Sequence, residues 1–259
     1  MTVTLTVLGS AGSHTGAGRL CSGYLLEAEG CTLLLDAGNG ATANLQRTHR
    51  LTDLDAVVIS HRHVDHCIDL IGAYYNLRFD PTSAGRLPLY AAAEVHDLLT
   101  GLLSGDSPMS FDDVFAHREV GHGDEVVVGP ARLRFARSVH PVPTVSTRIE
   151  VAGCTVVYSG DSAGGPDLVE IARDADLFLC EATWAGDPAS YPPDIHLTGE
   201  QAGAVAAEAG VARLVLTHIA GGTDRAAVLA EARAAFGGPV DLAEDLVRYE
   251  VVPGDLVAP

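Results

Sequence analysis

Residues 60–70 read SHRHVDHCIDL and follow the apolar stretch DAVVIS. This segment places three imidazoles and a carboxylate within six positions, at His61, His63, Asp65 and His66. Such polar side chains are costly to bury unless partners satisfy them. Neutral imidazole nitrogens and carboxylate oxygens are good ligands for Zn, Mn or Fe. The short spacing therefore predicts two ligands for each of two adjacent divalent cations.

Further ligands are expected at the ends of other predicted strands. Short apolar runs bounded by Gly, Asp and Asn recur along the chain and are typical of strands. Strand ends are rigid places for ligands, and several of these runs end in a polar residue: Asp36, His61, His140, Asp161, Glu181 and His218. His140, Asp161 and His218 are the natural additional ligands, and Asp161 can bridge both cations.

The order of the predicted elements favours an α/β fold. Strand-like runs alternate with helical patterns at 198–209, where Thr198 is a candidate N-cap, and at 224–235. The chain has no internal repeat and no low-complexity linker. We expect residues 1–259 to form one domain with two sheets and helices outside them.

Composition limits the classes of function and the location of the protein. The 34 acidic and 16 basic residues give a net charge of −18, and every basic residue is Arg. The absence of Lys excludes a Schiff-base or P-loop lysine, and the acidic balance disfavours nucleic acid as the main substrate. Five scattered Cys without a CxxC motif indicate reduced thiols of a cytoplasmic protein. Neither a signal peptide nor a membrane-spanning run is expected.

The combined motifs resemble the metallo-β-lactamase fold superfamily. The resemblance rests on HRHVDH at 61–66, His140, SGD with Asp161 and THI with His218, and it covers essentially the whole chain. It implies an αββα sandwich, with two mixed sheets and the metals at one edge. By this match the first metal takes His61, His63 and His140. The second takes Asp65, His66 and His218, and Asp161 bridges the two.

Two more stretches are similar to the ribonuclease Z-like phosphodiesterase branch. FLCEATW contains Glu181, and HLTGEQAG contains His196, with HLT in place of that branch's HST. The resemblance implies that Glu181 and His196 assist proton transfer to the leaving oxygen. We therefore expect Asp65, His196 and Glu181 to be the catalytic residues, with Asp65 also a metal ligand. Two divalent ions per chain, Zn first and Mn or Fe as alternatives, are the expected cofactors.

The expected substrate is a small phosphodiester. Ribonuclease Z enzymes usually carry a long tRNA-gripping arm between the third metal histidine and the bridging aspartate, whereas only 20 residues separate His140 from Asp161 here. The pattern most resembles atypical class II cyclic nucleotide phosphodiesterases of bacteria, which implies conversion of 3′,5′-cyclic AMP to 5′-AMP. The alternatives are an RNA or tRNA 3′ endonuclease and a lactonase or β-lactamase-type hydrolase. A third alternative is a metal-stabilised binding protein that has lost catalysis.

Four other features lead to weaker predictions. The Gly-rich loop 9–19 is either an ordinary turn or a rim of the site, and segment 102–115 is either a lid or a contact of a homodimer. Tyr74, Tyr75 and Trp184 are expected in the core or an interface rather than stacked on a base. The remaining histidines are expected at the surface or in turns: His14, His49, His96, His117 and His122.

Overall fold

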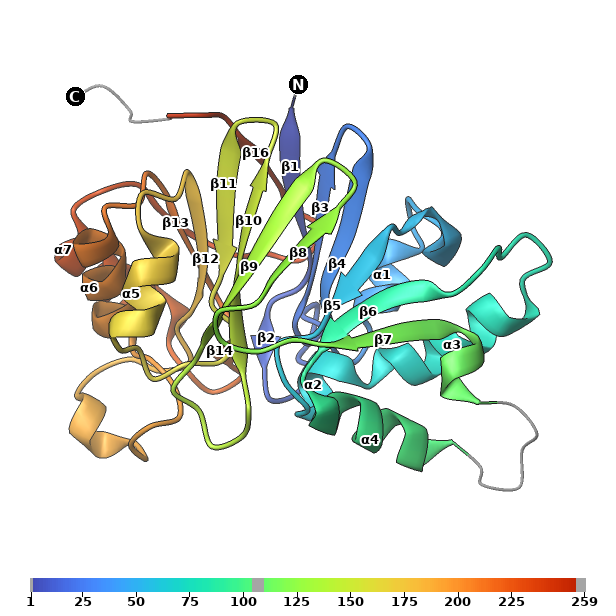
Figure 1. The fold of residues 1–259 in the computed structure, drawn as a ribbon. Coiled ribbons are helices and arrows are strands. Elements are labelled where there is room, and N and C mark those ends of the chain that lie inside the picture. The colour runs from blue at the N-terminus through green and yellow to red at the C-terminus, as the bar shows by residue number, and fades with distance from the viewer. Residues whose placement is uncertain (1, 104–109, 255–259) are drawn as a thin grey trace.

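Two seven-stranded β-sheets pack against each other in the middle of the molecule, and helices cover their outer faces (Figure 1). The structure is a computed structural model that describes residues 2–103 and 110–254. Helices α1 to α4 lie beside the first sheet, and α5 to α7 lie beside the second. This four-layered arrangement confirms the predicted αββα sandwich.

The first sheet has the strand order β16-β1-β3-β4-β5-β6-β7. It is mixed, because β16-β1-β3-β4 pair antiparallel and β4-β5-β6-β7 pair parallel. Its strands are β1 (Val3–Gly9), β3 (Gly23–Ala28), β4 (Cys31–Ala37), β5 (Ala56–Val58), β6 (Leu87–Ala91), β7 (Phe115–Glu119) and β16 (Arg248–Val251).

The second sheet has the order β15-β13-β12-β11-β10-β9-β8, with a parallel half at β11 to β15. A separate two-stranded ribbon pairs β14 with β2. These strands are β8 (Glu125–Val128), β9 (Ala131–Arg137), β10 (Val145–Val151), β11 (Cys154–Tyr158), β12 (Leu177–Glu181), β13 (Leu214–Thr217), β15 (Val240–Leu242), β2 (Ala11–Gly12) and β14 (Ile219–Ala220).

The helices begin and end close to where local sequence signals place them. Thr198 caps α6 by accepting a hydrogen bond from the Gln201 amide, and Gln201 closes a reciprocal capping box. Within 2–103 and 110–254, no helix has the length and hydropathy needed to cross a bilayer. The helices are α1 (Ala41–Leu45), α2 (Val64–Cys67), α3 (Asp69–Phe79), α4 (Ala93–Leu102), α5 (Pro166–Ala172), α6 (Gly199–Ala209) and α7 (Arg225–Phe236), with single 3₁₀ turns at Leu51–Asp53, Phe111–Asp113 and Pro188–Ser190.

Three hydrophobic clusters correspond to the three interfaces between the four layers. Leu33 of the first sheet and Leu179 of the second belong to the central cluster. Leu34 belongs to the cluster under α3 and α4, and Phe178 to the cluster under α5, α6 and α7. Neighbouring strand residues face opposite sides of a sheet, so both sheets are covered on both faces. The polar strand ends at the edge of this packed body are consequently held on a rigid frame.

Candidate active site

The predicted ligands come from both sheets and meet at one edge of the sandwich. His61 follows β5, and Asp65 and His66 lie in α2 immediately after it. His140, Asp161 and His218 follow β9, β11 and β13 of the second sheet. Helix α2 lies beside the β2–β14 ribbon, where the two halves of the molecule meet (Figure 1). The site is therefore assembled across the interface between the sheets.

The structure brings the predicted residues together in two groups. His61, His63, His140 and Asp161 form one group, and Asp65, His66 and His218 form the other, each with ligand atoms within 4.8 Å of one another. Their histidines and Asp65 are divided as in the two ligand sets that the resemblance implies, and Asp161 joins the first group.

Asp161 belongs to the first group and also faces the second. Its Oδ2 is 3.6 Å from His61 Nε2, whereas its Oδ1 is 3.2 Å from His66 Nε2 and 3.4 Å from His218 Nε2. One carboxylate oxygen therefore faces each group. This is the arrangement that a bridging ligand requires.

Hydrogen bonds fix the tautomers of His61 and His66. The His66 Nδ1–H donates to Asp36 Oδ2 at 2.7 Å. Ser60 Oγ donates to the same carboxylate, so His61 Nδ1–H donates to Ser60 Oγ at 3.0 Å. Because both Nδ1 atoms carry their protons outward, both Nε2 lone pairs are free to face inward, as in most metal-binding histidines.

His140 and His218 are oriented in the same way. His140 Nδ1–H donates to the Ile195 carbonyl at 2.9 Å. A carbonyl oxygen can only accept a hydrogen bond, so the proton of the neutral His140 ring must be on Nδ1. Thr183 Oγ1 donates to Glu181 and accepts from His218 Nδ1–H at 2.9 Å. His63 is the exception, because its Nδ1 faces the group, 2.9 Å from His61 Nε2 and 3.2 Å from His140 Nε2.

Charge and protonation in the cluster fit divalent cations. Burial lowers the pKa values of His61, His63 and His140, which keeps these imidazoles neutral. Burial opposes ionisation of Asp161, but the charged forms of the His218 and His66 imidazoles outweigh it and hold the Asp161 pKa well below the usual range. Burial also opposes the charge on His66, but Asp161 and Asp36 raise the pKa of His66 well above its usual value, so a bound cation would take the place of this proton. Asp161 Oδ1 is buried and has no hydrogen-bond partner in the described structure. A bound cation would accept the converging lone pairs and would give the unpartnered carboxylate oxygen a partner.

Asp36 is a buried hydrogen-bond partner of the cluster that the sequence did not reveal. It is fully buried, and besides His66 it accepts hydrogen bonds from the Ser60 backbone at 2.6 Å and the Tyr158 hydroxyl at 2.6 Å. Its backbone has φ +56°, which is unfavourable for a non-glycine residue. Its position at the end of a predicted strand was the one sequence feature that pointed to Asp36. Its contact with His66 depends on the tertiary fold.

Glu181 and His196 form a pair beside both groups. His196 Nδ1–H donates to Glu181 Oε1 at 2.8 Å, and Glu181 is fully buried. Burial opposes the charge on His196, but the Glu181 carboxylate outweighs it and raises the pKa of His196 to about 9. The His196 ring lies 5.5 Å from that of His140 and 5.2 Å from that of His218. His196 also lies within metal-ligating range of Asp161 and His218, but its Nδ1 is committed to Glu181.

The Gly-rich loop 9–19 forms part of the rim of this site. Its β2 segment pairs with β14, which directly follows His218. The Ser13 amide donates to Asp65 Oδ2 at 2.8 Å. Gly12 is packed so closely that an added Cβ would lie 2.9 Å from the His218 ring. The loop therefore supports one ligand from each sheet.

The remaining sequence candidates lie outside the two groups. Tyr74 is buried, and Tyr75 stacks on Phe79 at the surface. Trp184 stacks on Tyr191, with ring centroids 4.4 Å apart, and also meets the edge of His196. Of segment 102–115, residues 104–109 lie outside the described part. The other histidines belong to neither group: His14, His49, His96, His117 and His122.

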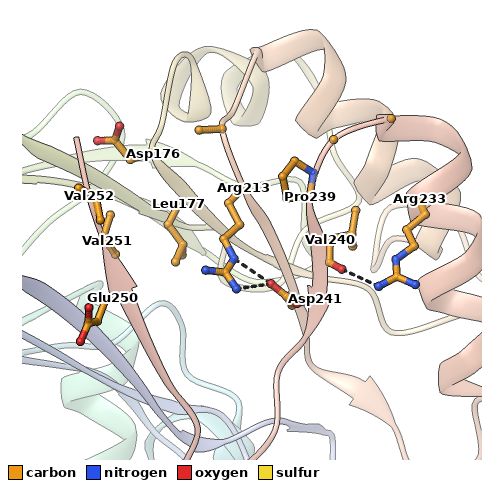
Figure 2. Close-up of a pocket in the computed structure, with 13 residues that line it drawn as sticks. Asp176, Leu177, Arg213, Arg233, Pro239, Val240, Asp241, Glu250, Val251 and Val252 are labelled. Carbon is orange, nitrogen blue, oxygen red and sulfur yellow. Dashed lines mark hydrogen bonds and ion pairs between the residues drawn. The ribbon is translucent and has the colours of Figure 1, made fainter. Parts of the chain in front are cut away.

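A cavity of about 580 Å³ lies elsewhere in the second sheet (Figure 2). Its lining includes Leu177 and Val240, the first residues of β12 and β15, so it opens at the opposite strand ends from the histidines. An ion pair between Arg213 and Asp241 crosses it. None of the predicted catalytic or metal-binding residues lines this cavity.

Comparison with known proteins identifies similar sequences over most of the chain. Residues 32–219 match the family model described as the beta-lactamase superfamily domain. An uncharacterized protein of Mycobacterium leprae is 40% identical over 246 residues, covering 93% of this chain and 86% of that one. Ribonuclease Z of Myxococcus xanthus is 30% identical, covering 95% of this chain and 97% of the relative. That alignment extends over 301 positions, more than the 259 residues of this chain, so the relative has insertions that the chain lacks.

Solved structures show the same architecture. The metallo-beta-lactamase fold protein YhfI from Bacillus subtilis superposes with a TM-score of 0.85 at 26% identity, covering 96% of this chain and 100% of that one. The short form of human tRNase Z superposes with a TM-score of 0.79 at 21% identity, covering 96% and 99%. The second similarity concerns the fold alone.

Proposed function

The chain belongs to the metallo-β-lactamase superfamily, as a metallo-hydrolase of its ribonuclease Z-like branch, and on this basis we propose that it is a dinuclear-metal phosphodiesterase. The proposed reaction cleaves the bond between phosphorus and O3′ of 3′,5′-cyclic AMP and gives 5′-AMP. The observation that carries this proposal is the Glu181–His196 pair beside two groups of ligands that share Asp161.

The two ligand groups would hold one divalent cation each. His61, His63 and His140 would bind the first, Asp65, His66 and His218 would bind the second, and Asp161 would contact both. Two such cations supply an activated water and neutralise charge on the phosphoryl oxygens. We propose Zn as the native metal, with Mn and Fe as the alternatives that imidazole and carboxylate ligands also suit.

His196 is placed to act as the general acid. Its proton would go to O3′ as the bond to phosphorus breaks, which prevents the release of an unprotonated alkoxide. Glu181 orients the ring through Nδ1 and favours its charged form. Glu181 itself is fixed by the Ser162 amide at 2.7 Å and the Thr183 hydroxyl at 2.8 Å. The proton donor is thus held in one orientation relative to the ligand groups.

The chain between His140 and Asp161 supports a small substrate. It consists of β10 and β11, which form an antiparallel hairpin with a turn at Ala152 and Gly153. No arm extends from it, and the net charge of −18 opposes binding of a polyanion. Ribonuclease Z activity is the second candidate because of the relatives that carry this name.

A panel of substrates tests this proposal. The metal-loaded protein should hydrolyse cyclic AMP to 5′-AMP faster than it cleaves precursor tRNA, a lactone or a β-lactam. Product analysis should show 5′-AMP and no 3′-AMP. Faster 3′ processing of precursor tRNA at about 0.15 M salt would establish the nuclease instead, and faster opening of the lactone would establish an acyl hydrolase.

A further inference from the structure

A second cavity of about 470 Å³ adjoins the candidate active site and shares His196 with it. This volume is within the range of about 300–1,000 Å³ that is typical of small-molecule sites. Ala163, two residues after the shared ligand Asp161, also lines it. The cavity therefore lies next to the place where we expect the reaction.

An aromatic pair forms one wall of this cavity. The rings of Trp184 and Tyr191 are nearly parallel, with an interplanar angle of 5°. The Tyr191 hydroxyl donates to the Ala185 carbonyl at 2.6 Å, and the Trp184 amide donates to the Leu197 carbonyl at 3.2 Å. Pro188, Pro192 and Pro193 also line the cavity. Proline restricts the backbone, so this wall is fixed before a ligand arrives.

Two polar side chains in the lining are available to a ligand. The Gln201 Oε1 accepts from the Thr198 backbone amide, while the side-chain nitrogen Nε2 of Gln201 has no partner among the described residues. The Asp194 carboxylate likewise accepts no hydrogen bond from the described part of the chain, and Asp194 is exposed. The cavity thus combines flat apolar walls with one free donor and one free acceptor.

We propose that this cavity is a nucleobase subsite, which deepens and rests on the proposed phosphodiesterase function. If His196 protonates O3′, the ribose lies against His196, and the base on that ribose must lie on the leaving-group side. A planar heterocycle with both donors and acceptors suits the aromatic pair, Asp194 and Gln201. The Asp194 carboxylate would repel a second phosphate, so the subsite favours a mononucleotide over a polynucleotide.

The chain offers a direct optical test, because Trp184 is its only tryptophan. Titration with adenosine, which contains no phosphate to be hydrolysed, should change the fluorescence of Trp184 saturably. Ribose should not produce this change. Excitation at the long-wavelength edge of tryptophan absorption avoids interference from the nucleoside.

Conservative variants locate the binding. Asp194→Asn should weaken adenosine binding about tenfold, as expected for loss of a hydrogen bond to a charged group. It should also raise KM for cyclic AMP without changing hydrolysis of methyl p-nitrophenyl phosphate, which has no base.

Asp174→Asn is the matched control, because Asp174 has a similar left-handed backbone (φ +54° against +60° for Asp194) and does not line this cavity. Gln201→Glu keeps the capping oxygen and removes the donor, so it should weaken binding without unfolding α6.

The outcomes separate the subsite from the reaction. Cyclic AMP hydrolysis without a saturable adenosine signal would overturn the subsite and leave the proposed function intact. A saturable adenosine signal that Asp194→Asn weakens would support the subsite even if no phosphodiester were hydrolysed. Equal effects of Asp194→Asn and Asp174→Asn would overturn the assignment to this cavity.

Discussion

His196 is the residue whose replacement should separate proton donation from metal binding. His196→Ala should slow cyclic AMP hydrolysis by about 10²–10⁴-fold, the usual value of general acid catalysis, and should leave the metal content unchanged. The loss should be much smaller for a p-nitrophenyl phosphodiester, because that leaving group needs no proton. Steady-state rates with metal analysis of each preparation provide the measurement.

The exposed His122 offers a control for that variant. His122→Ala should leave both rates unchanged, and Glu181→Gln should reproduce part of the His196→Ala pattern, because Glu181 orients the ring. Equal losses on both substrates, or loss of a metal, would show that His196 is a ligand or a structural residue.

Asp36 should control metal affinity without being a ligand. Asn tolerates φ +56°, so Asp36→Asn should preserve the backbone. The substitution removes the negative charge of the group that accepts the hydrogen bond from His66 Nδ1–H. Loss of such an outer partner typically weakens metal binding by about 10–100-fold. Competition with a chelator measures the change, and an unaltered affinity would mean that Asp36 serves only the packing of Tyr158 and Ser60.

The ligands and their orienting groups differed in how far the sequence revealed them. His61, His63, Asp65 and His66 are adjacent in sequence, so the motif itself predicted that they share a site. The roles of Asp36 and Thr183 depend on hydrogen bonds to His66 and His218, which lie 30 and 35 positions away. Such contacts exist only after the strands have been ordered in the sheets.

At the scale of elements, the β2–β14 ribbon positions His218 and supports Asp65. Gly12→Ala would place a Cβ 2.5 Å from the His218 carbonyl oxygen, so the ribbon or His218 must move. We expect weaker binding of the second metal and lower activity, with little change in secondary structure. Gly16→Ala in the same loop meets nothing within 4 Å and should behave like the unmodified protein. Isothermal titration of the metal-free variants makes this comparison.

The accuracy of the predicted elements followed the strength of their hydrophobic signals. Among the short apolar runs that are typical of strands, LPLYA at 87–91 and CTVVY at 154–158 form β6 and β11. No strand pattern marks β7 (FAHRE), because its polar residues resemble a loop and its strand state comes from pairing with β6. No helical pattern marks α3 (DLIGAYYNLRF), which has almost no amphipathic periodicity. Tertiary packing, which a local pattern does not contain, determined both elements.

At the scale of the molecule, the proposed cations would connect the two sheets. The first sheet supplies His61 through His66, and the second supplies His140, Asp161 and His218. Bound cations should therefore stabilise the folded chain by mass action, by about 2.7 kcal/mol per site at a free metal concentration of 100 times Kd. For a chain of this size, each kcal/mol corresponds to roughly 2–4 °C in the thermal midpoint.

Calorimetry with and without metal tests this connection. Loading with Zn should raise the thermal midpoint by about 5 °C or more per occupied site, and a chelator should reverse the change. Asp161→Ala should abolish most of the increase, because this carboxylate faces both groups. An equal increase in Asp161→Ala would place the stabilising metal elsewhere on the protein.

The pairing of β1 with β16 has a consequence for the order of events during synthesis. Val3 of β1 pairs with Val251, so the first sheet lacks its edge strand until residue 251 has left the ribosome. His218 emerges only shortly before, and the second ligand group is incomplete without it. A nascent chain that exposes HRHVDH thus has no finished site to load. Cation uptake should consequently begin only after residue 218 has emerged, and ribosome-bound chains stalled before residue 218 should acquire no stable dinuclear centre.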